Sequence, residues 1–195
     1  MTWEKTAIAA FIECGYEQVD LTNLAEKCGL ESAYFTSGFK DKYHLFQHLM
    51  EACFSLLAER LERVFQENEH PVVRLHRLLL AFGEFGIEQP ECYQIAMMIR
   101  PVHEPQHFPV ESAVRVRGIF RKAYRQAAKA GYVSDEVPLE QAVQGLMCVI
   151  HGTVSSLLVL TRINMTEPRR LLAYVTSNYL AGMLSPQSIP FLHNR

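Results

Sequence analysis

Apolar residues recur at steps of three and four positions along almost the whole chain, which is the spacing of one face of an α-helix. The alternation of apolar and polar residues that is typical of a strand never lasts more than a few positions. The pattern therefore predicts an all-α protein. Three short helical segments end near residues 14, 28 and 37, and about six longer ones begin near residues 40, 71, 90, 111, 138 and 168.

Glycine, proline and one aspartate mark the ends of the expected helices. Gly15 follows the first helix and is well placed for the left-handed conformation that ends helices. Asp20 is an N-cap candidate for the second helix, and Gly29 follows that helix. Pro71 and Pro90 open two of the longer helices, because proline is tolerated in a first helical turn.

We expect two domains and a tail. Residues 1–46 form a three-helix N-terminal module, residues 47–185 form a larger helical domain, and residues 186–195 form an irregular tail that contains two prolines. The boundary falls inside the long helix that begins near Lys40, so the two domains are predicted to be joined by a continuous helix rather than by a flexible linker.

Composition narrows the class of protein. Of the 195 residues, 49% are hydrophobic, which is enough for a buried core and argues against disorder. The formal net charge of −2 gives no whole-chain signal for nucleic acid. The apolar stretch 142–163 includes His151, Ser155 and Arg162, which favours a buried helix over a membrane span. With no signal region at the start, a cytoplasmic protein without a membrane partner is expected.

The five cysteines show no pattern of a disulfide framework or a zinc site. They are odd in number and far apart in the sequence: Cys14, Cys28, Cys53, Cys92 and Cys148. No cluster of lysine or arginine stands beside any of them. Small buried thiols in a reducing cytosol are the expectation, although a redox sensor stays open, and no cofactor is expected.

The segment LTNLAEKCGL (residues 21–30) meets the physical demands of a helix-turn-helix. Ala25 is small where two helices would cross, Gly29 suits a left-handed turn, and Leu30 can fill the core behind the next helix. The second helix of such a motif is the one that enters the DNA major groove.

A longer run, AFIECGYEQVDLTNLAEKCGLESAYFTSGFKDKYHLF (residues 10–46), resembles the DNA-binding region of the TetR family of transcriptional regulators. Phe39, Lys42 and Leu45 are similar to the entry of that family's fourth helix. Further on, the stretches IEQPECYQIAMMI and AGYVSDEVPLEQAV and the pair His151–Gly152 resemble one subgroup of its ligand-binding domains. The resemblance implies a helix-turn-helix module followed by a helical domain for ligand binding and dimerisation.

The family resemblance implies a function for the whole chain. We expect a homodimer that binds a double-stranded DNA operator and responds to a small apolar effector, most simply a repressor that the effector releases from DNA. The expected DNA contacts are Thr22, Ser32, Tyr34, Thr36, Ser37 and Lys42, with Lys42 on a phosphate and the residues of the third helix near base edges.

The charge of the module favours an alternative. Residues 1–50 contain four lysines and seven carboxylates, a net charge of −3, and only Met1 and Thr2 precede the first helix where the family usually has a basic arm. Phosphate neutralisation supplies most non-specific DNA affinity. The alternative is therefore a TetR-fold protein with weakened or lost DNA binding that acts by binding a ligand or another protein.

Aromatic and methionine side chains concentrate in the middle of the chain, where they suggest a pocket for an apolar ligand, although core packing explains the same pattern. The candidate ligand contacts are Phe82, Phe85, Tyr93, Met97, Met98, Phe120, Tyr124, Met147, His151 and Ser155.

The last two long helices are apolar enough to form a two-fold four-helix bundle with a second copy of the chain. The expected dimer contacts are Leu157, Leu158, Leu172, Val175, Tyr179 and Met183.

The sequence gives weaker support for a metal site, for an enzyme and for a basic docking surface. His103 and His107 are four residues apart, but the prolines around them break any helix and no further ligand completes a metal site, so no metal is expected. No nucleophile–base motif or phosphate-binding glycine loop points to an enzyme. The only strong basic cluster is either a solvated helix face or a docking surface for an acidic partner or anionic ligand, and it comprises Arg115, Arg117, Arg121, Lys122, Arg125 and Lys129.

Overall fold

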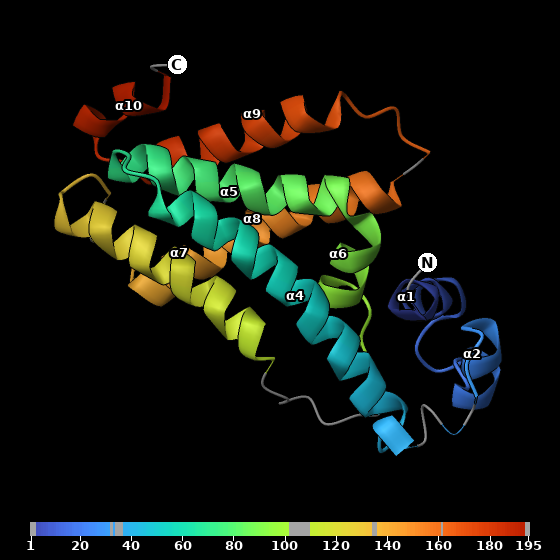
Figure 1. The fold of residues 1–195 in the computed structure, drawn as a ribbon. Coiled ribbons are helices and arrows are strands. Elements are labelled where there is room, and N and C mark those ends of the chain that lie inside the picture. The colour runs from blue at the N-terminus through green and yellow to red at the C-terminus, as the bar shows by residue number, and fades with distance from the viewer. Residues whose placement is uncertain are drawn as a thin grey trace. The chain divides into compact units, whose positions relative to one another are not determined.

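The structure is a computed structural model that describes residues 3–193 except 32, 34–36, 102–109, 134–135 and 161. The described residues form α-helices, one short 3-10 helix and one isolated bridge between Val133 and Leu184, so the prediction of an all-α protein is confirmed (Figure 1). The chain divides into two compact units, the first made of Met1–Leu56 and Gln89–Ala113 and the second of Leu57–Glu88 and Val114–Arg195.

The first unit has an aromatic core. Its elements are α1 (Trp3–Cys14), α2 (Leu21–Lys27), the first part of α4 (Lys42–Gln66) and α6 (Pro90–Met97). α1 packs on both α2 and α6. The ring centroid of the fully buried Phe11 lies 5.1 Å from that of Phe46 and 5.9 Å from that of Tyr16. These three rings anchor the short helices on α4, which the two units share.

The second unit is built on a closely packed trio of helices. Its elements are the end of α4, α5 (Pro71–Glu88), most of α7 (Glu111–Lys129), α8 (Leu139–Val159), α9 (Pro168–Ala181), η1 (Pro186–Ser188) and α10 (Pro190–His193). α5, α8 and α9 pack on one another. A Cβ atom at Gly83 would lie 2.4 Å from Cδ1 of Leu172, so α5 and α9 approach closely only because residue 83 is glycine.

Most of the expected helix ends are confirmed. Gly15 and Gly29 have φ angles of 77° and 68°, the left-handed conformation that ends a helix. The long helix expected from Lys40 begins at Lys42, because Asp41 caps it. The Asp41 carboxylate accepts hydrogen bonds from N and Nδ1 of His44, both at 2.9 Å, and the backbone bond is the main reason that the pKa of Asp41 is lowered.

The expectation of an irregular tail is wrong for the described part of residues 186–195. Pro186 and Pro190 are the first residues of η1 and α10. Proline is tolerated at this position because the first N–H groups of a helix have no partner within it. The Phe191 ring stacks on the His70 imidazole with centroids 3.9 Å apart and an interplanar angle of 16°. Burial of this imidazole lowers the pKa of His70. The described part of the tail is therefore helical and packs on His70 within the second unit.

Candidate functional site

α2 is capped at its start and followed by a left-handed turn, the local features expected for the first half of a helix-turn-helix. The Asp20 carboxylate accepts hydrogen bonds from the backbone N–H groups of Thr22 (2.9 Å) and Asn23 (3.0 Å), which makes it the N-cap of α2. At the other end the Leu30 N–H donates to the Ala25 carbonyl at 2.9 Å across the left-handed Gly29. Three sequence expectations are thereby met: the cap at Asp20, the small buried residue at 25 and the turn at 29.

The structure describes only some of the predicted DNA contacts. Thr22 is exposed on the first turn of α2, and Ser37 is exposed in a helical conformation. Ser32, Tyr34 and Thr36 lie outside the described residues. The assignment of all five to DNA stays a prediction.

Lys42 has a partner inside the first unit. Its Nζ donates a hydrogen bond to the Glu17 carbonyl at 3.1 Å and lies 4.7 Å from the centroid of the Tyr16 ring. These contacts fasten the start of α4 to the segment between α1 and α2. A phosphate contact by the same ammonium group has to compete with them or share its remaining N–H donors.

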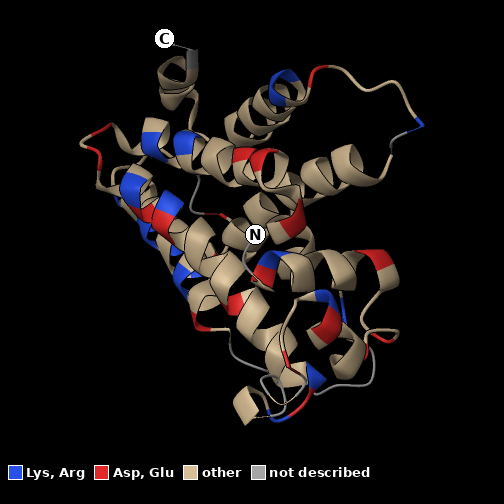
Figure 2. Cartoon of the chain, turned by 45° about the vertical axis from the view of Figure 1, so that its right-hand side comes forward, with Lys and Arg blue, Asp and Glu red and all other residues tan. Residues whose placement is uncertain are grey.

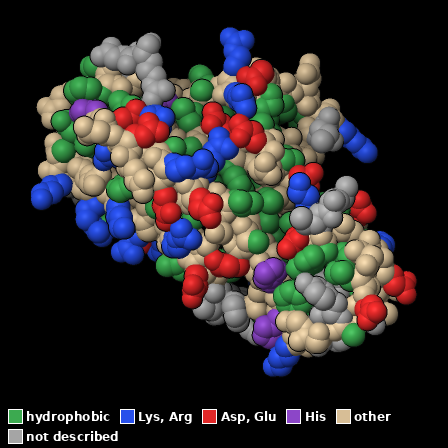
Figure 3. Space-filling view, in the orientation of Figure 1, with side chains coloured by type: hydrophobic (Ala, Val, Ile, Leu, Met, Phe, Trp, Pro, Cys, Tyr) green, Lys and Arg blue, Asp and Glu red, His purple; other side chains and the backbone are tan. Residues whose placement is uncertain are grey.

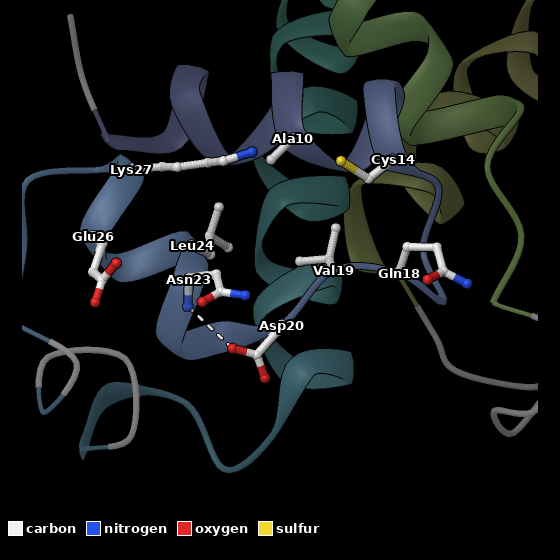
Figure 4. Close-up of a pocket in the computed structure, with 9 residues that line it drawn as sticks. All are labelled: Ala10, Cys14, Gln18, Val19, Asp20, Asn23, Leu24, Glu26 and Lys27. Atoms are coloured by element: carbon white, nitrogen blue, oxygen red, sulfur yellow. Dashed lines mark hydrogen bonds between the residues drawn. The ribbon is translucent and has the colours of Figure 1, made fainter.

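A surface hollow of about 420 Å³ lies beside α1 and α2 (Figure 4). It is lined by Ala10, Cys14, Gln18, Val19, Asp20, Asn23, Leu24, Glu26 and Lys27. The Lys27 side chain extends along α1 toward Ala10, and none of the ten predicted ligand contacts lines this hollow. Sequence reasoning assigned no role to Asn23 or Lys27, although both flank the buried Leu24 at the spacing of an exposed helix face.

Basic side chains gather on α7 (Figures 2 and 3). Several of them are paired: Arg115 with Glu62 at 3.0 Å, and both Arg117 and Arg121 with Glu140. The hydrogen bond from Arg117 is the main cause of the lowered pKa of Glu140. Lys122, Arg125 and Lys129 are also exposed, so α7 presents both paired cations and a solvated face.

The candidate ligand contacts fall into two groups by burial. Five are nearly inaccessible, namely Phe82, Phe85, Tyr93, Phe120 and Tyr124. The other five are half-buried, namely Met97, Met98, Met147, His151 and Ser155. Burial raises the pKa of Tyr124, with a smaller effect from Tyr179. Tyr93, Met97 and Met98 belong to the first unit and the other seven to the second, so the role of the set as one site stays a prediction.

One of the candidate dimer contacts needs correction. Leu172 is 1% exposed and packs against Gly83 within the chain, so it offers no surface to a second copy. Leu157, Leu158, Val175 and Met183 are half-buried. Tyr174 on α9, which is not among the expected dimer contacts, is 68% exposed.

Much of α8 is only partly buried in a single chain. It is long and apolar enough, by length and composition, to cross a membrane, and only 28% of its most apolar window is buried. One such helix is weak evidence for a membrane, because core and interface helices have the same composition. Val159 at its end is 61% exposed.

Among the described residues no group of three His, Cys, Asp or Glu side chains is arranged to hold a metal ion. His103 and His107 lie outside these residues.

Comparison with known proteins identifies the fold. No protein-family model matches the sequence, and no curated protein matches it. Solved structures do match over nearly the whole chain. The transcriptional regulator FadR from Bacillus subtilis, solved with stearoyl-CoA, is similar with a TM-score of 0.79 at 14% identity, covering 93% of this chain and 97% of FadR.

Two further regulators show the same likeness. The TetR-family regulator PfmR from Thermus thermophilus has a TM-score of 0.69 at 17% identity, covering 94% of this chain and 98% of PfmR. The ketosteroid regulator KstR2 of Mycobacterium tuberculosis has a TM-score of 0.68 at 19% identity, with coverages of 94% and 93%. The chain therefore has the fold of TetR-family transcriptional regulators, as the sequence predicted.

Proposed function

Starting from the TetR fold, we propose that this chain is a member of that family and a cytoplasmic, homodimeric, DNA-binding transcriptional regulator controlled by a small apolar effector. In its simplest form it is a repressor that the effector releases from DNA. The observation that carries the proposal is the capped α2 and the left-handed turn at Gly29, because this local geometry is what presents a recognition helix to a major groove.

The likeness to transcriptional regulators supports a binding protein rather than an enzyme. In a dimer, two recognition helices would enter successive major grooves about 34–36 Å apart. α4 contributes residues to both units and is a continuous helix of 25 residues, which makes it the natural element to carry an effector signal to the module. A coupling of about 1–3 kcal/mol between effector and DNA is sufficient for control.

Selection from random double-stranded DNA tests this function. The protein is incubated with the library at low and at moderate salt, and the bound sequences are read. We expect enrichment of a palindrome whose half-sites are about 10 base pairs apart, with affinity that falls as salt rises. Retention of no DNA at low salt would overturn the proposal.

Exposed apolar side chains on α8 and α9 support the homodimer. Val159 is 61% exposed, Tyr174 68% and Tyr179 36%. Buried against the same face of a second copy, these residues would complete a four-helix bundle in which each patch meets its own equivalent. Covering this surface also accounts for the low burial of α8 in a single chain.

A matched pair of variants tests the interface. We expect Val159→Glu combined with Tyr174→Glu to convert the dimer to a monomer in light scattering, because two carboxylates would be desolvated in the seam. The control is Val114→Glu on α7, which changes a residue of similar exposure, 64%, outside α8 and α9. A dimer that survives the double change, or a control that dissociates, contradicts this interface.

An effector with an acyl chain fits the aromatic and methionine side chains of the middle helices. FadR was solved with stearoyl-CoA, which supports the same chemical class here.

Stearoyl-CoA should raise the melting temperature of the wild type by mass action. Met97→Trp should remove this shift by filling space at a candidate contact, while Met165→Trp, in the segment before α9, should leave it intact. Equal shifts in both variants would exclude Met97 from the site.

A second candidate function has its own observation. The module is net −3, and its Lys42 ammonium is already bonded to the Glu17 carbonyl and stacked on Tyr16. This arrangement favours a TetR-fold protein with weakened or lost DNA binding that acts by binding a ligand or another protein. The DNA selection separates the two, because this candidate predicts little or no enrichment of any DNA sequence even at low salt.

A further inference from the structure

The C-terminal part of α7 carries cations that no carboxylate of the described chain neutralises. Lys122, Arg125 and Lys129 follow one another at steps of three and four residues, so they lie on one face of the helix, and all three are exposed. These three residues form the 122–129 face. The side chain that reaches this part of α7 from α5 is a further cation, because Arg74 donates to Oε1 of Gln126 at 2.8 Å. Positive charge therefore gathers along α7 (Figures 2 and 3).

The N-terminal part of α7 shows which chemistry the same helix binds. Nη2 of Arg115 lies 3.0 Å from both oxygens of the Glu62 carboxylate on α4. Arg117 and Arg121 both bind the Glu140 carboxylate on α8, at 2.5 Å and 2.7 Å. Carboxylates that project from other helices therefore partner these arginines. In the part of the chain that the structure describes, no helix brings a carboxylate within ion-pair distance of the 122–129 face.

We propose that the 122–129 face is a docking surface for an acidic helix of another protein. An α-helix rises 1.5 Å per residue, so the three cations span about 10 Å along α7. Glutamates at steps of three and four residues on a second helix have the same spacing, so each can meet one cation, as flanking charges do in paired helices. The face uses none of the residues of the proposed DNA, effector or dimer sites, so it does not depend on them.

Nucleic acids and anionic membranes fit this face less well. α7, which the structure describes in full, buries Phe120 and Tyr124, so the bases of a single strand would find no exposed ring to stack on. Val114, near the start of α7, is its only exposed large apolar side chain, which leaves nothing near Lys122 to insert into a lipid surface. The Glu140 carboxylate would repel a continuous row of phosphates, whereas a partner helix carries carboxylates only at some positions.

Fluorescence anisotropy of labelled synthetic peptides tests the surface. One peptide is a helix rich in alanine and glutamine, with glutamates at steps of three and four residues on one face. The second has the same composition, with the glutamates spread around the helix. The full-length protein should bind the first peptide about tenfold more tightly than the second, although their charges are equal. This affinity should fall as salt rises, because exposed charges are screened. Short double-stranded DNA and vesicles of anionic lipid are titrated in parallel.

Neutralising the 122–129 face should weaken binding of the one-faced peptide about tenfold. This variant combines Lys122→Gln, Arg125→Gln and Lys129→Gln, which are surface changes, and its melting temperature shows that it is folded. The matching variant with three glutamates at these positions should bind a one-faced peptide in which lysines replace the glutamates, and the wild type should not.

A second triple variant controls for net charge. Lys5→Gln, Arg162→Gln and Arg170→Gln remove three exposed cations outside α7 and should leave the affinity for the one-faced peptide unchanged. Equal losses in the two glutamine variants, or equal binding of the two acidic peptides by the wild type, would overturn the proposal. Tighter binding of DNA or of vesicles than of the one-faced peptide would also overturn it.

Discussion

In the first unit the carboxylates of Asp20 and Asp41 cap the starts of helices, whereas in the second unit, where Glu167 caps α9, other carboxylates join helices by binding arginines. Asp20 and Asp41 accept bonds from backbone N–H groups. Glu88 on α5 instead binds Arg60 on α4 at 2.6 Å and Arg169 on α9 at 2.7 Å. Carboxylates therefore act on helix starts at Asp20 and Asp41, and they join helices at Glu88.

Net charge alone is a poor guide to where DNA would bind, because carboxylates of neighbouring helices already pair with some of the exposed cations. α7 carries six cations against one carboxylate, a net charge of +5, yet three of these cations have carboxylate partners from α4 or α8. The module, which contains the capped α2 and the left-handed turn at Gly29, is net −3. Any DNA affinity of the module must come mainly from shape and hydrogen bonding, and its acidity should limit that affinity.

The largest expected effect tests the claim that packing dominates in the second unit. Gly83→Val should lower the free energy of unfolding by about 2–3 kcal/mol, because the new side chain collides with the buried Leu172. Gly118→Val is the control, since a Cβ atom there would meet nothing within 4 Å, and it should change stability by less than about 0.5 kcal/mol. Urea denaturation measures both. Equal losses would show that α5 and α9 do not approach closely at residue 83.

An intermediate effect is expected at the cap of α2. Asp20→Ala should cost about 1 kcal/mol, because the N–H groups of Thr22 and Asn23 lose their acceptor. Asp20→Ser keeps an acceptor at that position and should recover most of the loss. Hydrogen exchange of the amides in α2 measures the effect locally. Faster exchange in both variants alike would mean that the carboxylate charge, and not the cap, holds the helix.

The smallest effect is expected from the ion pairs of the second unit. Glu88→Gln should cost about 0.5–1 kcal/mol at neutral pH and less in high salt, because the pairs are partly exposed. The Arg60 guanidinium lowers the pKa of Glu88, so this stability is present above the unfolded pKa of about 4.3 and is lost as pH falls through the folded pKa. Melting temperatures of wild type and variant should therefore converge toward acidic pH. A gap that persists there would assign the effect to packing.

Local features of the fold were predictable from the sequence, and contacts between distant segments were not. Gly15, Gly29 and Asp20 were identified because their roles depend on a few neighbouring residues. Leu172 was misassigned to the dimer surface because steps of three and four mark an apolar face without showing what covers it. Here the chain's own Gly83 covers it.

The candidate sites show the same limit. The spacing of the five cysteines does not distinguish Cys53, which is buried, from Cys92, which is half-buried. The hydrogen bond from Lys42 to the Glu17 carbonyl spans 25 residues and likewise has no sequence signal. The family resemblance assigned Lys42 to a phosphate contact and gave no indication of its hydrogen bond to the Glu17 carbonyl.

The most direct measurement of the central claim is a DNA titration of the wild type beside a module with less negative charge. Asp20→Thr keeps a side-chain acceptor at the cap of α2 and, combined with Glu31→Ser, removes two carboxylates, while Glu59→Gln combined with Glu111→Gln removes two carboxylates outside the module. If the module binds DNA, the first variant should bind selected DNA on the order of tenfold more tightly at low salt, and the control should match the wild type. Failure of the wild type and the module variant alike to bind any DNA at low salt would contradict the account.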